Sequence, residues 1–388
     1  MDKALVKFKA FPEDFIVEEI GEDYSCNCSS SPDELQQARV DLGRISMTNN
    51  GFLICDLEKI NLDHFSVFEI LSKKLDKHLG EFGYAGTKDK AAWTCQRISI
   101  FNPDLEKIKR FSFGGVCLKN FKWSKHKIEI GDLIGNRFKI TLRDADKDAI
   151  KILKRLRNSD RLPNFFGSQR FGSLRGDNVE IGKLIFKRKF KEAVWMLLTG
   201  YGNEEDQEVK EAKKKLVKEK NLQEARSYFP EKLKQELRIL DYLSNKPDDW
   251  LGALSMVSEK TLLIICQSVQ SEIFNDILQK VIDEEFSLHD NKVILPGHNT
   301  QFSGGRLGFI EKEVLESNNI RLSDFELKEI PFLTFKGSKR DAFSKVRELT
   351  VDTESDEIFT GSKKIMLSFI LDSGVYATTF LEQFFELS

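Results

Sequence analysis

The feature of this sequence that most constrains its fold is a change of pattern along the chain. Strand-like segments, with alternating or clustered apolar residues, occur near both ends. They cover residues 6–9, 15–17, 51–57, 94–101, 136–143 and 364–371. From about residue 165 to residue 333, long charged helical segments dominate instead, as in residues 205–243. This order predicts an α+β chain whose tail returns to the first domain.

We therefore expect two domains. One comprises residues 1–164 and 345–388, and the other is a mostly helical module inserted at residues 165–344. A chain of 388 residues with 40% hydrophobic residues is large enough to build two cores. A helix is also expected at residues 67–79, whereas residues 23–42 are expected to form a polar surface loop.

The charge of the whole chain does not identify a partner, because 60 basic groups oppose 62 acidic ones and leave a net charge of -2. The charge is nevertheless uneven. Residues 105–161 carry sixteen Lys and Arg against seven Asp and Glu, which would suit a phosphate backbone. The alternative is ordinary solvated surface, which is the commoner use of a charge run.

Cysteine and apolar patterns exclude several classes of protein. The six cysteines contain no CxxC pair and the five histidines are isolated, so no metal site is expected. Cys26 and Cys28 lie in a Ser-rich loop, where free thiols in a reducing compartment are expected. No stretch approaches the roughly 18 consecutive apolar residues of a membrane span. We expect a cytoplasmic protein that carries neither a signal peptide nor a membrane anchor.

Common catalytic signatures are missing. There is no GxxxxGK[ST], GxGxxG, HExxH or GxSxG string, so the common cofactor and hydrolase classes are disfavoured. A tight polar turn remains at residues 86–90 (GTKDK), directly before an expected strand. It holds one carboxylate between two ammonium groups. Taken alone this is an ordinary turn, because Gly and Asp are frequent turn residues.

Five segments, in order along nearly the whole chain, change the interpretation of this turn. They are FKAFPEDFIVEE (8–19), GYAGTKDKAAWTCQ (83–96), GNRFKITLR (135–143), PNFFGSQRFG (163–172) and SGVYATTFLEQF (373–384). Together they resemble the TruD family of pseudouridine synthases, and PNFFGSQRFG is the most specific. The resemblance implies a catalytic domain with a mixed, largely antiparallel sheet and an inserted TRUD domain. It also implies a cofactor-free isomerase that acts on tRNA, at uridine 13. A monomer is expected, although the sequence leaves the oligomeric state open.

The resemblance assigns three catalytic residues. The family's nucleophile is the aspartate that matches Asp89, and such a carboxylate can add to C6 or C1′ of a uridine and later leave. Lys9 is implied as the cation that keeps the carboxylate ionised, although a solvated strand lysine is the alternative. Phe138 is implied as the ring against the flipped base, although with 31 phenylalanines a core role is the alternative.

Further residues of these motifs are expected to bind substrate or to brace the site. Lys88 and Lys90 flank the nucleophile and are expected to meet phosphates or solvent. The other candidates are Asn136, Arg137, Asn164, Gln169 and Arg170.

Two other functions stay open on the sequence alone. A noncatalytic RNA-binding or RNA-folding protein on the same scaffold would bind tRNA without isomerising it. A small-molecule phosphate binder would use the loop at residues 83–90. Only the enzyme would release tritium from 5-tritiated uridine in tRNA.

Overall fold

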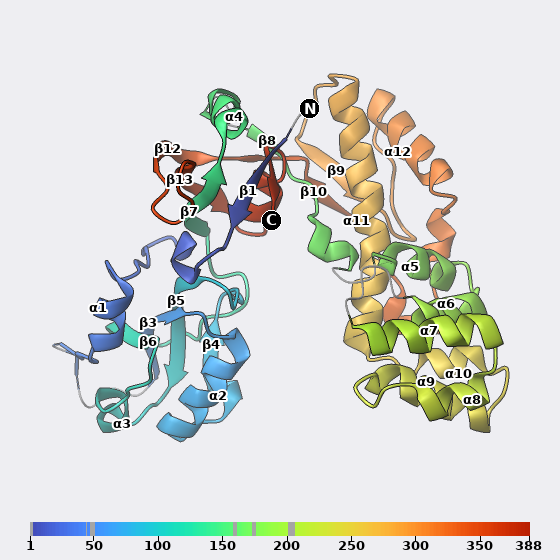
Figure 1. Cartoon of the computed structure of the whole chain (residues 1–388), viewed down its shortest axis with the longest axis horizontal. Coiled ribbons are helices and arrows are strands. Elements are labelled where there is room, and N and C mark those ends of the chain that lie inside the picture. Colours follow the sequence, from blue (N-terminus) through green and yellow to red (C-terminus); the bar gives the residue numbers. More distant parts are fainter. Residues whose placement is uncertain (1–2, 44, 47–50, 158–160, 173–175, 201–205) are drawn as a thin grey trace. The chain divides into compact units, whose positions relative to one another are not determined.

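The computed structural model describes residues 3–43, 45–46, 51–157, 161–172, 176–200 and 206–388. The chain divides into two compact units (Figure 1). Unit 1 comprises Met1–Leu162 with Ser344–Ser388, and unit 2 comprises Pro163–Phe343. Unit 2 is therefore inserted in the sequence of unit 1.

Unit 1 is built on a ten-stranded sheet with the order β12-β13-β7-β2-β5-β3-β6, in which β1 also pairs with β7 and β14, and β4 with β5. The strands are β1 (Ala4–Phe8), β2 (Phe15–Ile20), β3 (Phe52–Ile60), β4 (Phe82–Tyr84), β5 (Trp93–Phe101), β6 (Val116–Ser124), β7 (Gly135–Ala145), β12 (Arg347–Ser355), β13 (Lys363–Asp372) and β14 (Phe385–Leu387). The β2–β5 and β1–β14 pairs are parallel, and the other pairs are antiparallel. The mixed, largely antiparallel sheet confirms the expected α+β class.

The helices of unit 1 are α1 (Pro32–Gln37), α2 (His64–Leu75), α3 (Leu105–Lys109), α4 (Lys147–Arg157) and α13 (Ala377–Leu381). Helix α2 starts earlier than the sequence predicted because the Asp63 side chain caps it by accepting from the Ser66 amide. It ends earlier because Asp76 adopts a left-handed conformation. Helix α1 lies in the expected surface loop, where Ser31 is the N-cap and Pro32 is the first helical residue.

The register of the sheet sorts the central residues onto two faces, because successive strand residues point to opposite sides. We call the side that carries Val17 face A. Phe138 lies opposite Val17, Thr94 lies beside it, and Lys59 lies opposite Thr94, so these side chains share face A. Apolar residues of α2, α4 and α13 pack into the cores on this side. Helix α1 contributes Leu35 to a small cluster on the opposite side, face B.

Unit 2 has a separate apolar core built around its longest helix, α11. Its helices are α5 (Asn178–Phe186), α6 (Phe190–Thr199), α7 (Gln207–Glu219), α8 (Leu222–Tyr228), α9 (Lys234–Asn245), α10 (Trp250–Leu254), α11 (Glu259–Asp283) and α12 (Gly305–Ser317). Strands β9 (Lys292–Leu295) and β10 (Ser338–Asp341) of this unit pair with each other. Strands β8 (Arg161–Pro163) and β11 (Phe343–Lys345) also pair, where the chain passes from one unit to the other. Among the described residues, no helix combines the length and apolarity needed to cross a membrane.

Candidate active site

The turn that carries Asp89 joins β4 to β5, and contacts from face A hold its main chain. The Gln96 amide donates to the carbonyl of Gly86 at 3.0 Å. The Lys59 ammonium donates to the carbonyl of Asp89 at 2.6 Å. Both donors come from strands of the central sheet, so the turn is fixed to a rigid base. This arrangement suits a catalytic group, which must be held in one geometry.

The carboxylate of Asp89 pairs with Lys9, which lies 80 residues earlier in the chain. The Nζ atom of Lys9 is 2.8 Å from Oδ2 of Asp89, and the two side chains are 17% and 57% exposed. Lys9 follows β1 with a φ of 56°, a left-handed value that is unusual for a lysine. Its Nζ also lies 4.0 Å from the centre of the Phe15 ring. The structure therefore brings together the two residues expected to form the catalytic pair.

Phe138 lies behind this pair within the apolar core of unit 1. Its ring centre is 6.0 Å from that of Phe15 and 5.5 Å from that of Phe369, on which it is stacked. The residue is only 6% exposed. The core alternative considered for Phe138 thus describes its packing, and the link to the catalytic pair runs through Phe15.

Lys88 does not face solvent, although it was expected to contact substrate. It is buried and pairs with the buried carboxylate of Glu19 at 2.7 Å. Glu19 also accepts from the Tyr24 hydroxyl at 2.8 Å and from the Arg97 amide at 3.1 Å. A phosphate could reach Lys88 only by displacing this network, so the structure gives Lys88 a role in anchoring the turn. Lys90, in contrast, is exposed.

The two polar candidates of the GNRF string point to opposite faces of the sheet. Asn136 shares face A with Phe138, and its Oδ1 is buried without a hydrogen-bond partner among the described atoms. Arg137 points to face B, where it pairs with Glu348 at 3.1 Å. The expected substrate contact of Arg137 is therefore not on the side of the sheet that holds Asp89. Of these two candidates, only Asn136 offers an unused polar atom on that side.

The candidates of the PNFFGSQRFG string lie in unit 2, and some of them belong to its 3-10 helix η3 (Ser168–Phe171). Asn164 and Arg170 form hydrogen bonds within this unit. Asn164 donates to the carbonyl of Asp341 at 3.0 Å and accepts from Arg340 at 2.6 Å. Arg170 donates to Ser271 at 3.2 Å and to Gln267 on α11 at 3.0 Å. The side chain of Gln169 lies outside the described part of the chain. These contacts lie within unit 2, so the expected roles of bracing the site or contacting RNA stay predictions.

Two buried titratable groups lie close to the turn that carries Asp89, and neither was a candidate from the sequence. Burial lowers the pKa of Lys59 to about 8, although the charge of Asp89 opposes this shift. Burial, helped by the charges of Lys59 and Lys88, lowers the pKa of His64 to about 4. His64 packs edge-on against Tyr84, with ring centres 4.6 Å apart. A sequence signal for Lys59 does exist, since it continues the inward alternation of Leu57 in β3.

Cys26, Asp56 and Cys95 form a buried cluster whose ligand-type atoms lie within 4.8 Å of one another. Asp56 and Cys95 point to face B, and Cys26, in the mostly exposed loop after β2, is itself buried. Both carboxylate oxygens of Asp56 are already bonded, to Arg97 at 3.1 Å and to Asn120 at 2.8 Å. We assign no metal to this cluster, because its only carboxylate is neutralised by Arg97.

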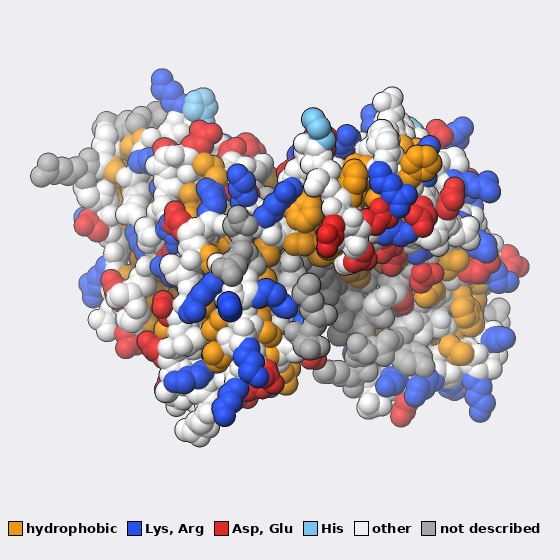
Figure 2. Space-filling model, turned by 90° about the horizontal axis from the view of Figure 1, so that it is seen from above, with side chains coloured by type: hydrophobic (Ala, Val, Ile, Leu, Met, Phe, Trp, Pro, Cys, Tyr) orange, Lys and Arg blue, Asp and Glu red, His pale blue; other side chains and the backbone are white. Residues whose placement is uncertain are grey.

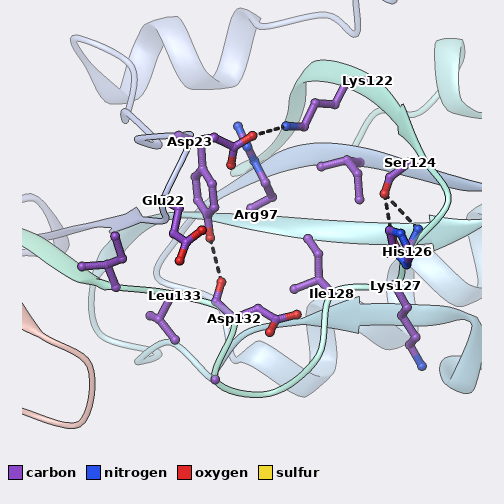
Figure 3. Close-up of a pocket in the computed structure, with 14 residues that line it drawn as sticks. Glu22, Asp23, Arg97, Lys122, Ser124, His126, Lys127, Ile128, Asp132 and Leu133 are labelled. Carbon is purple, nitrogen blue, oxygen red and sulfur yellow. Dashed lines mark hydrogen bonds and ion pairs between the residues drawn. The ribbon is translucent and has the colours of Figure 1, made fainter.

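A pocket of about 480 Å³ also lies in unit 1 (Figure 3). Tyr24 and Arg97 both line it, with the guanidinium carbon 3.8 Å from the ring centre. Lys122 pairs with Asp23 at 3.0 Å at the rim. Arg97 points to face B, and the pocket contains none of the candidate residues. The candidate active site is therefore the turn on face A.

This arrangement of sheet, insertion and charged turn matches one known family. The family model described as tRNA pseudouridine synthase D (TruD) matches residues 2–293 and 290–384. The chain therefore belongs to the TruD family of tRNA pseudouridine synthases, and enzymes of this class are isomerases.

Individual relatives cover most of the chain. A "Probable tRNA pseudouridine synthase D" of Methanosarcina barkeri is 30% identical over 385 residues, covering 87% of this chain and 88% of the relative. A protein of the same printed name from Methanopyrus kandleri is 32% identical over 340 residues, covering 84% of each. The crystal structure of a TruD protein from Methanosarcina mazei superposes with a TM-score of 0.82 at 26% identity, covering 99% of this chain and 94% of that one.

Proposed function

We propose that this chain is a tRNA pseudouridine synthase that isomerises the uridine at position 13, with Asp89 as its covalent nucleophile. The observation that carries the proposal is the pair of Asp89 and Lys9, only 2.8 Å apart, on a turn fixed to the central sheet. The carboxylate is 57% exposed, so a substrate can reach it, while its main chain is held from below. An accessible, positioned carboxylate is what a nucleophilic mechanism requires.

The reaction that this site would perform changes no atom count in the substrate. The Asp89 carboxylate adds to C6 or C1′ of the uridine, and the bond between N1 and C1′ breaks. The base turns, C5 bonds to C1′, the C5 proton leaves and N1 gains a proton when the carboxylate departs. Lys9 would keep the carboxylate charged as the flipped base displaces water from the site.

Phe138 is proposed to support the site from behind. A side chain that is 6% exposed offers little ring surface to a base. Its contact with Phe15 instead fixes the ring over which the Lys9 ammonium lies. Asn136 is proposed to bind the base or the turn, because its buried Oδ1 is unused on the same face.

The RNA backbone is proposed to contact the outer side of α4. This helix buries Ala149, Leu153 and Leu156 and exposes the basic face formed by Lys147, Lys151, Lys154 and Arg157. Figure 2 looks onto the side of unit 1 where α4 lies, and Lys and Arg side chains gather there. Because the helix packs on face A, its charges lie on the same side of the sheet as Asp89.

Release of tritium from tRNA that contains 5-tritiated uridine tests this function. The C5 hydrogen is lost only if the base is reattached through C5, so we expect up to one tritium released per tRNA. The same tRNA with cytidine at position 13 should release none. If neither RNA nor total cellular tRNA releases tritium while binding persists, the noncatalytic alternative is correct.

A further inference from the structure

Lys59 is 1% exposed although it carries an ammonium group. It lies near the end of β3, opposite Thr94 at the start of β5. Because β5 begins directly after the catalytic turn, this register places Lys59 beneath that turn. Its Nζ donates to the carbonyl of Asp89 at 2.6 Å and to that of Leu62 at 2.8 Å. The lysine thus joins the loop before α2 to the main chain of the candidate nucleophile.

A lysine in this position is costly for the fold. Taking an ammonium out of water is unfavourable, and an apolar side chain of similar length would avoid that cost. Burial accordingly lowers the pKa of Lys59. Its two carbonyl partners belong to loops on either side, and one of them is Asp89 itself. The benefit that offsets the cost therefore lies in the geometry of this turn.

The two lysines around Asp89 divide the work of holding it. Lys9 contacts the carboxylate itself. This ion pair must break when the carboxylate attacks the substrate. Lys59 contacts only the main chain, so its bonds can persist through the reaction. Since Lys59 is buried, it is not a group that a tRNA touches.

We propose that Lys59 is a positioning residue for the reaction, which fixes the Asp89 main chain so that the carboxylate meets the flipped uridine. The inference rests on the proposed nucleophilic role of Asp89. A displacement of about 1 Å in a reacting group can lower the rate about 100-fold. Binding of tRNA uses other surfaces and should not respond.

The test compares Lys59→Met with the wild type in single-turnover tritium release and in tRNA binding. We expect the rate of the chemical step to fall about 100-fold, while the Kd for tRNA changes by less than about twofold. Hydrogen exchange of the amides at residues 86–92 should become faster in the variant. A folded Lys59→Met protein with the wild-type rate overturns the proposal.

Lys213→Met is the matched control. Lys213 is also fully buried and donates to a main-chain carbonyl, that of Gly200, at 2.8 Å, but it lies on α7 in unit 2. Its loss should lower stability without slowing the folded enzyme. If both variants slow the reaction equally, Lys59 has a general structural role and the proposal fails.

Three further outcomes can be distinguished. If Lys59→Met does not fold, Lys59→Gln replaces it. Its N–H donor lies one bond closer to the main chain than Nζ of lysine, so the turn should still shift and the rate should still fall. A wild-type rate in that variant overturns the inference. If Asp89→Asn keeps normal turnover, the proposed function fails whatever Lys59 does. If Asp89→Asn is inactive and the folded Lys59 variants are normal, only the role of Lys59 is wrong.

Discussion

At the scale of single residues, the account depends on one ion pair. Replacing Lys9 with Met should lower the rate of the chemical step about 10- to 100-fold, equivalent to about 1.4–2.7 kcal/mol. The reason is that no cation would then contact the Asp89 carboxylate as water leaves the site. Single-turnover tritium release measures the effect, and Lys9→Arg should recover part of the rate. Lys7→Met, on β1 just before Lys9, should leave the rate unchanged. A normal rate in Lys9→Met would contradict the assignment.

His64 makes the stability of unit 1 depend on pH. Its pKa is lowered to about 4 in the folded protein, against 6.5 ordinarily, because burial disfavours the imidazolium. Between these values the unfolded chain binds more protons, so stability falls as pH falls from 6.5 towards 4. The wild type should lose more unfolding free energy than His64→Phe when the pH falls from 7 to 5, by about 2 kcal/mol. Urea denaturation at both pH values checks this, and an unchanged loss would show that His64 is not responsible.

The sequence predicted the residues of this site unevenly. Asp89 and Lys9 were identified through motif resemblance, since no spacing rule joins residues 80 positions apart. Lys59 and Glu19 escaped because their contacts depend on which strands pair and in what register. The alternation of β3 places Lys59 on the same face as Leu57. A charged residue in a strand is normally exposed, however, so this alternation alone did not predict its burial.

At the scale of secondary-structure elements, α4 is the proposed contact with RNA phosphates. Changing Lys147, Lys151 and Lys154 to Glu should weaken tRNA binding at least about tenfold and leave the rate at saturating tRNA unchanged. The slope of log Kd against log salt concentration should fall by about one for each lysine lost. The control changes Lys215, Lys218 and Lys220 of unit 2 to Glu, which should leave tRNA binding unchanged. Equal binding by the α4 variant would place the RNA elsewhere.

The elements that the sequence missed share a physical cause. Helix α1 is too short to show a periodic pattern, so its Ser31 cap and Pro32 were hidden in a polar segment. Strand β6 was overlooked because its second half lies at the edge of the sheet and carries lysines. In the sequence these lysines form part of the basic run at residues 105–161. Longer elements with a buried face, such as β7 and α2, were predicted with errors only at their ends.

At the scale of the whole molecule, each unit has an apolar core of its own. The core around α11 uses only residues of unit 2, and the other clusters use only residues of unit 1. Residues 163–343 alone should therefore fold into a helical protein that melts cooperatively. Circular dichroism of this fragment checks the prediction, and a chain without a melting transition would show that unit 2 depends on unit 1.

The central claim is that the Asp89 carboxylate attacks the uridine, and Asp89→Asn tests it most directly. The amide keeps the size of the side chain but lacks the charge and the nucleophilic oxygen. Asp76→Asn is a suitable control, since Asp76 also pairs with a lysine, at 3.2 Å, but lies at the end of α2 and outside this turn. We expect no tritium release by Asp89→Asn, with tRNA affinity within about twofold of the wild type, and normal release by Asp76→Asn. Wild-type tritium release by Asp89→Asn would contradict the account.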